Sequence, residues 1–192
     1  MALKNVWSLQ VDEALVANEL KERLKSKDID VFFPFNAQMK DIDLVVMNLK
    51  TKKVATIQVK GSRTYPPQRK EIQRYGEGNA GWITITERQI EHPSNKIDFF
   101  IFIIHSLTRV GEKIGIQLNY LVLPFDEFQQ IVKQNKIVNN KKDYNFFVWI
   151  NPVKKQAFDF HEKGQKEPGK VIDLTKCLNN WEPLRNCLKV DK

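Results

Sequence analysis

The stretch IDLVVMNLKTKKVATIQVKGSR, residues 42–63, contains two apolar runs separated by a short polar segment. The runs 42–47 and 54–60 have the composition of β-strands, and the lysine-rich segment 48–53 resembles a hairpin loop. We therefore predict a β-hairpin at this place in the chain.

The register of this hairpin decides which side chains share a face. If Asn48 pairs with Lys53 across the loop, Asp43 lies opposite Gln58, with Cβ atoms about 5 Å apart. Lys60 follows two residues after Gln58 and therefore projects from the same face. The register gathers a carboxylate, an amide and an ammonium group on one face of an otherwise apolar hairpin.

A helix is predicted at residues 11–24, where apolar residues recur at helical spacing and include Val16 and Leu20. Glu13 falls on the same stripe, where a carboxylate without a partner would be unfavourable. A helix packed on the hairpin would bring Glu13 towards Asp43.

The remaining pattern predicts an α/β fold with a mixed sheet flanked by helices. The run DFFIFIIH at 98–105 is nearly continuous in apolar residues, which is typical of a central strand covered on both faces. A long irregular connection is expected at 61–81. Further strands are predicted at 31–33, 82–86, 117–123 and 144–150. One helix is predicted to run to about Asn135 with Asp126 as its N-cap. A last helix is predicted after Asp173, which would cap it.

Composition limits the classes of function. The chain has 192 residues, of which 42% are hydrophobic and 28% charged, which suits one globular domain. No apolar run is long enough for a membrane span or a signal peptide, so we expect a cytoplasmic protein without membrane contact. The net charge of +8 favours a polyanionic partner. The scattered histidines and the two cysteines match no zinc motif.

The hairpin residues suit metal-assisted phosphodiester hydrolysis. Asp43 and the Gln58 oxygen can supply hard ligands to Mg²⁺ or Mn²⁺, and Glu13 can add a direct or water-mediated contact. Such a metal activates water, and Lys60 would position that water or stabilise the transition state. No small-molecule organic cofactor is expected.

Three segments resemble the PD-(D/E)XK nuclease superfamily, especially its QxK branch, which is related to methyl-directed restriction enzymes. They are DEALVANEL at 12–20, IDLVV at 42–46 and IQVKGSR at 57–63. A weaker likeness extends to DFFIFI at 98–103 and NNW at 179–181.

The resemblance implies a restriction-endonuclease-like fold and a Mg²⁺-dependent DNA endonuclease of restriction, mobile-element or defence biology. It places the metal-binding aspartate at Asp43, the (D/E)XK strand at Gln58-Val59-Lys60 and the helix carboxylate at Glu13. It also implies one nuclease-like domain over 1–192, with a core at about 8–135 and a C-terminal elaboration at about 136–192. Gln58 replaces an acidic ligand, so weaker metal affinity is expected.

Simpler interpretations exist for each residue. Asp43 can be a turn residue, and Asp41 competes with it for the metal role. Gln58 and Lys60 can form the solvent face of an edge hairpin. Glu13 can merely complement the helix dipole.

A basic stretch follows the hairpin and is predicted to hold the DNA backbone. Its cations are Arg63, Arg69, Lys70 and Arg74, with tyrosines interspersed. A solvated loop is the alternative.

Two further functions remain open from the sequence. One is a catalytically inactive nuclease-fold protein that binds nucleic acid, and the other is a subunit of a defence complex. Symmetric cleavage of duplex DNA would imply a homodimer.

Overall fold

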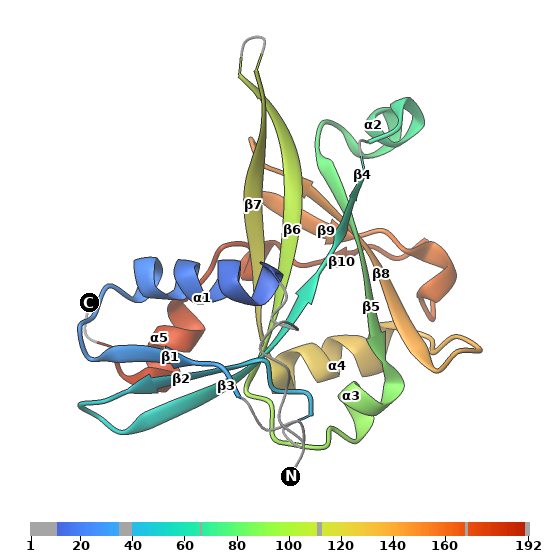
Figure 1. The fold of residues 1–192 in the computed structure, drawn as a ribbon. Coiled ribbons are helices and arrows are strands. Elements are labelled where there is room, and N and C mark those ends of the chain that lie inside the picture. Colours follow the sequence, from blue (N-terminus) through green and yellow to red (C-terminus); the bar gives the residue numbers. More distant parts are fainter. Residues whose placement is uncertain (1–10, 35–39, 66, 111–112, 168, 191–192) are drawn as a thin grey trace.

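Two five-stranded β-sheets flanked by helices make up the computed structural model, which describes residues 11–34, 40–65, 67–110, 113–167 and 169–190 (Figure 1). The first sheet has the order β1 (Ile29–Phe32), β2 (Leu44–Asn48), β3 (Lys53–Gly61), β6 (Phe99–Val110) and β7 (Lys113–Pro124). Its β3–β6 pair is parallel and its other pairs are antiparallel, so this sheet is mixed, as predicted.

The second sheet is antiparallel throughout. Its order is β10 (Ile172–Asp173), β9 (Gln156–Asp159), β8 (Asp143–Asn151), β5 (Asn79–Thr86) and β4 (Arg63–Tyr65). The helices are α1 (Val11–Leu24), α2 (Arg69–Tyr75), α3 (Glu87–Glu91), α4 (Phe125–Asn135) and α5 (Glu182–Leu188). Residues after 136 thus supply three strands of this sheet and the last helix.

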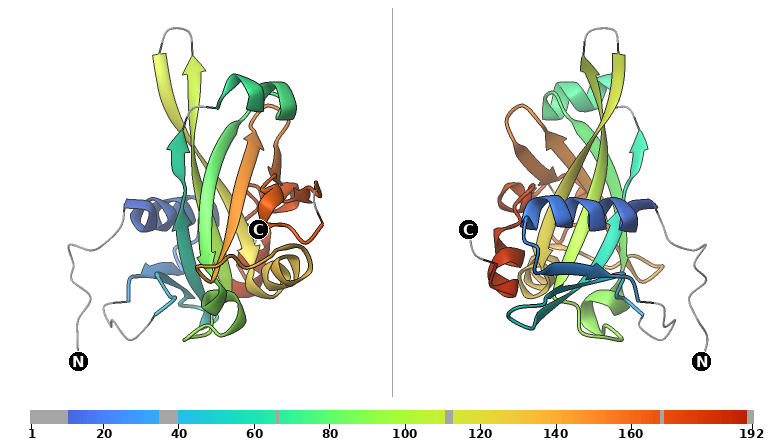
Figure 2. Two further views of the ribbon diagram at one scale, coloured as in Figure 1. Left: turned by 90° about the vertical axis from the view of Figure 1, so that its right-hand side faces the viewer. Right: turned by 60° about the vertical axis from the view of Figure 1, so that its left-hand side comes forward.

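Helix α1 has the predicted bounds and lies across the outer face of the first sheet (Figure 2). Val16 and Leu20 of its apolar stripe have no exposed surface, so the face of α1 that meets the sheet has to be apolar. They pack with Ile57 and Val59 of β3 and with Leu184 of α5 in one hydrophobic core.

A second core lies between the two sheets and includes α4. Strand β6 serves both cores by alternation: Ile101 and Ile103 belong to the first core, whereas Phe100 and Phe102 belong to the second. This confirms the prediction of a central strand covered on both faces and explains its continuous apolar run.

The predicted hairpin register is confirmed. Asn48 pairs with Lys53 and Leu44 with Ile57. One residue before β2, the backbone N–H of Asp43 donates to the carbonyl of Ile57 at 2.9 Å. The hairpin thereby carries Asp43 to the side of Gln58.

The prediction of an irregular connection at 61–81 was wrong. The chain crosses from the first sheet to the second at Ser62, forms β4 against β5 and continues into α2. Both elements depend on distant partners, since β4 needs β5 and Tyr75 at the end of α2 stacks on Phe160, with ring centroids 4.0 Å apart. Local sequence carries no sign of those partners.

Two predicted helix caps were also wrong. Helix α4 begins at Phe125, whose N–H donates to the carbonyl of Asp98 at 2.9 Å, so Asp126 lies in its first turn. Asp173 accepts from the N–H of Thr175 at 2.8 Å, but only a 3₁₀ turn follows, and α5 starts later, at Glu182. Among the described residues, no helix combines the length and apolar character that a bilayer crossing needs.

Candidate functional site

Asp43 and Gln58 are in direct contact on one face of the β2–β3 hairpin. One carboxylate oxygen of Asp43, Oδ2, accepts from the backbone N–H of Val59 at 2.8 Å and from Nε2 of Gln58. The predicted opposition of these two residues is therefore present. Because two donors converge on one oxygen, the carboxylate is held in a fixed orientation.

Gln58 is buried, with 5% of its surface exposed, and has partners at both ends of its amide. Its Oε1 accepts from Nε2 of Gln89 at 3.2 Å. Gln89 belongs to α3, is itself buried, and forms a capping box with Thr86. Sequence reasoning missed Gln89, and the only local signal was the Thr86-x-x-Gln89 spacing of that capping box.

Asp41 is held in an ion pair with Arg88. It also accepts from Nε2 of Gln89 at 3.3 Å, so the amide of Gln89 bonds both Asp41 and Gln58. Arg88 donates through both terminal nitrogens to the two oxygens of Asp41, at 2.6 and 2.7 Å, and the N–H of Ser94 donates at 3.0 Å. Burial raises the pKa of Asp41, but the hydrogen bonds of Arg88 and Ser94 outweigh it and hold the pKa below its usual value. This geometry ties Asp41 to α3.

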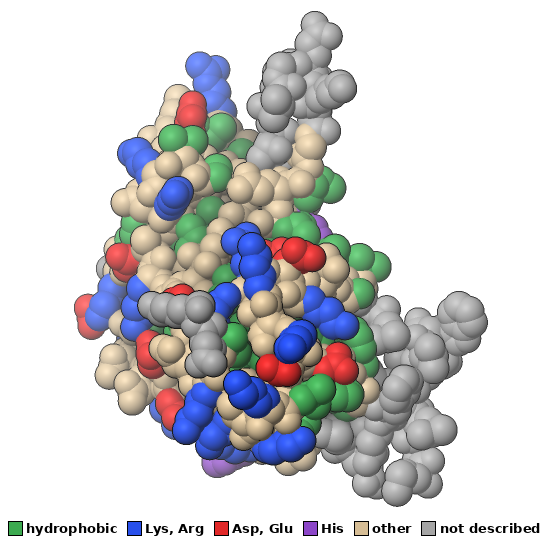
Figure 3. All heavy atoms as spheres, turned by 90° about the vertical axis from the view of Figure 1, so that its left-hand side faces the viewer, with side chains coloured by type: hydrophobic (Ala, Val, Ile, Leu, Met, Phe, Trp, Pro, Cys, Tyr) green, Lys and Arg blue, Asp and Glu red, His purple; other side chains and the backbone are tan. Residues whose placement is uncertain are grey.

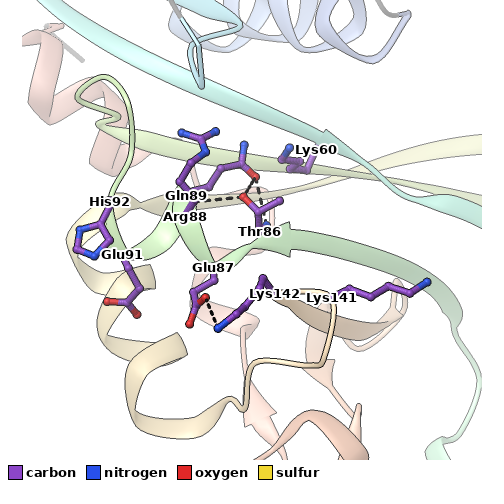
Figure 4. Close-up of a pocket in the computed structure, with 9 residues that line it drawn as sticks. All are labelled: Lys60, Thr86, Glu87, Arg88, Gln89, Glu91, His92, Lys141 and Lys142. Carbon is purple, nitrogen blue, oxygen red and sulfur yellow. Dashed lines mark hydrogen bonds and ion pairs between the residues drawn. The ribbon is translucent and has the colours of Figure 1, made fainter.

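Lys60 lies on the same face as Gln58 and borders a cavity of about 770 Å³. Figure 4 shows it across from Thr86, Arg88 and Gln89 of the α3 region. Burial lowers the pKa of Lys60, while the negative charges of Asp43 and Asp41 act in the opposite direction. Lys60 is therefore a recessed cation that gives up its proton more readily than an exposed lysine.

Glu13 lies on the buried stripe of α1, with 5% of its surface exposed. Helix α1 covers the face of β3 that carries Ile57 and Val59, whereas Gln58 and Lys60 point to the other face. The first turn of α1 reaches the end of β3, since a Cβ on Gly61 would overlap the Asp12 carboxylate. The structure therefore brings together three of the four predicted residues on one face of the hairpin. The fourth, Glu13, lies on the helix that covers the opposite face, so the packing of α1 does not place it among the other three.

The predicted basic stretch divides between two elements. Arg63 lies in β4, while Arg69, Lys70 and Arg74 lie in α2, which sits on the second sheet away from the hairpin (Figures 1 and 2). Arg74 forms an ion pair with Glu162. Figure 3 shows that cations on the α1 side are interspersed with acidic side chains over most of this face and gather along its lower edge.

The donor atoms of this cluster match a divalent cation only in part. Among the described residues, no group of three or more histidine, cysteine, aspartate and glutamate side chains has the geometry of a metal site. Asp43 and Gln58 suit a hard cation by donor type. As arranged, Gln58 turns its amide nitrogen to Asp43 and its oxygen to Gln89. The pair fits one cation only if the Gln58 amide turns over.

The fold and the site define an α/β protein with a carboxylate–amide–lysine cluster on a β-hairpin. Comparison with known proteins found no matching family model, no similar curated protein and no similar solved structure. The function is therefore inferred from the site.

Proposed function

We propose that the protein is a Mg²⁺-dependent endonuclease that hydrolyses DNA phosphodiester bonds, with a restriction-endonuclease-like site of the QxK type. The observation that carries the proposal is the contact of Asp43 with Gln58 on the face from which Lys60 reaches a cavity. A carboxylate, a neutral oxygen donor and a recessed cation beside a space open to substrate are the groups that this hydrolysis uses.

Each residue has a definite task in this proposal. Asp43 and the Gln58 oxygen would hold the cation, and Glu13, on the helix over the opposite face of β3, would not be one of its ligands. Bound there, Mg²⁺ would supply an activated water and offset negative charge on the phosphate. Lys60 would donate a hydrogen bond to the phosphate or to the attacking water. One P–O bond forms to the water oxygen, one P–O ester bond breaks, and the leaving oxygen takes up a proton.

The experiment is cleavage of supercoiled plasmid in Mg²⁺ or Mn²⁺. We expect nicked or linear DNA from the wild type, and a loss of roughly 100-fold or more in rate from Asp43→Ala and from Lys60→Ala. Lys53→Ala is the matched control, because Lys53 is an exposed lysine of the same strand. Intact plasmid with the wild type, or equal cleavage by Lys60→Ala, would disprove the assignment.

A second function is a non-catalytic protein that binds DNA, alone or as a subunit of a defence complex. The bond from Gln89 to Gln58 Oε1 favours it, because it directs that oxygen away from Asp43. This alternative predicts salt-sensitive DNA binding that persists in EDTA and survives Asp43→Ala.

A further inference from the structure

The cavity beside Lys60 is built from elements of both halves of the chain. Its far wall is the segment between α4 and β8, which supplies Lys141 and Lys142 (Figure 4).

The segment that carries the two lysines is fixed in place. The side-chain oxygen of Asn139 accepts from the N–H groups of Lys141 and Asp143, at 2.8 and 3.1 Å. Lys142 adopts a left-handed backbone with φ of 63°, which is unusual for a residue with a side chain. Its carbonyl accepts from the N–H of Glu87 at 2.7 Å, so the turn is fastened to α3.

The cations of the cavity differ in their availability. Arg88 is committed to Asp41, and Lys60 lies recessed at the hairpin. Lys141 and Lys142 are exposed at the rim, and the side chain of Lys142 keeps 75% exposure despite a 3.5 Å ion pair with Glu87. The same cavity is lined by the carboxylates of Glu87 and Glu91, and Lys141 and Lys142 are its two exposed lysines.

We propose that this cavity receives the backbone of duplex DNA, with Lys141 and Lys142 binding phosphates next to the one at Lys60. The inference rests on the proposed function and identifies how its substrate enters. Two point charges on a rigid turn suit consecutive phosphates, because they neutralise charge without a large loss of backbone entropy. The basic stretch at 63–74 lies on β4 and α2, and its binding of DNA stays a separate prediction.

The test measures binding of a 30-bp duplex by fluorescence anisotropy in EDTA, across a range of salt concentrations. Lys141→Gln/Lys142→Gln should weaken binding about tenfold near 0.1 M salt and lower the slope of log affinity against log salt by about 2. The matched control is Lys52→Gln/Lys53→Gln. It removes another exposed pair of adjacent lysines, which lies at the end of β3 far from Lys60. Lys52, like Lys142, has a left-handed backbone.

The outcomes separate this inference from the proposed function. Binding that needs Lys141 and Lys142, with no cleavage in Mg²⁺, supports the inference and removes the catalytic proposal. Cleavage in Mg²⁺, with binding that does not change in Lys141→Gln/Lys142→Gln, supports the catalytic proposal and overturns the inference. The inference is also overturned if the control pair, or Arg69→Gln/Lys70→Gln, lowers affinity and slope as much, or if the wild type does not bind DNA.

Discussion

Gln58 has hydrogen-bonding partners at both ends of its amide group, and they define what a single substitution would change. The amide nitrogen donates to Asp43, and the oxygen accepts from Gln89. A carboxylate at this position would keep the acceptor for Gln89 and lose the donor to Asp43. Two adjoining carboxylates repel each other unless a cation lies between them.

Gln58→Glu should therefore make stability depend on Mg²⁺. Without divalent cations we expect the variant to melt below the wild type, and with Mg²⁺ to gain more than the wild type does. Free Mg²⁺ at a hundredfold excess over its Kd adds about 2.7 kcal/mol. Thermal melts with and without Mg²⁺ measure this difference. Asp43→Asn/Gln58→Glu, with one carboxylate, is the control, and an equal Mg²⁺ shift in wild type and Gln58→Glu would refute a cation site.

Lys60 provides the pH-dependent prediction at the residue scale. Because burial lowers its pKa, Lys60 should lose its proton below pH 10.5, the usual value for lysine. The negative charge of Asp43 raises that pKa, so Asp43→Asn should lower it further. NMR titration of ¹³C-labelled lysine side chains measures both values, with Lys60→Arg used for assignment. An upward shift in Asp43→Asn would contradict the proximity of the two charges.

At the scale of elements, local pattern was sufficient for α1 and for the β2–β3 hairpin. The helical spacing of apolar residues predicts α1, and two apolar runs around a polar loop predict the hairpin. Asp43, Gln58 and Lys60 could therefore be placed on one face of the hairpin from the sequence. Helix α3 could not be placed against them. It spans only Glu87–Glu91, and its contacts are made by Gln89, 31 positions from Gln58, and by Arg88, which pairs with Asp41 before β2.

The docking of α3 on the hairpin can be measured through the hydrogen bond between Gln89 and Gln58. Gln89→Leu leaves the buried oxygen of Gln58 without its donor, so a loss of about 1–3 kcal/mol in unfolding free energy is expected. Gln58→Leu/Gln89→Leu should lose less than the sum of the two single variants, because both ends of the bond are removed together. Urea unfolding of the four proteins gives the coupling energy. Strict additivity would show that the contact contributes nothing.

At the scale of the whole molecule, two hydrophobic cores lie on opposite faces of β6, and a charge pair that no sequence pattern indicated is buried against the second sheet. Lys136 follows α4, and Asp159 ends β9. Their side chains have no exposed surface, and Nζ of Lys136 lies 2.8 Å from Oδ2 of Asp159. The two residues are 23 positions apart, and in the sequence each has the pattern of an exposed charged residue.

This pair should control the stability of the second sheet. Lys136→Met leaves the Asp159 carboxylate buried without its cation, so we expect a loss of about 3–5 kcal/mol. The backbone N–H groups of Phe147 and His161 still donate to Asp159, at 2.8 and 3.0 Å, and they fix the carboxylate in the interior. Lys136→Met/Asp159→Asn removes both charges and should recover part of the loss.

Chemical denaturation measures each variant against Lys176→Met, which breaks the exposed ion pair with Glu127 and should cost at most about 1 kcal/mol. Equal effects of Lys136→Met and Lys176→Met would mean that the buried charges do not hold the sheet.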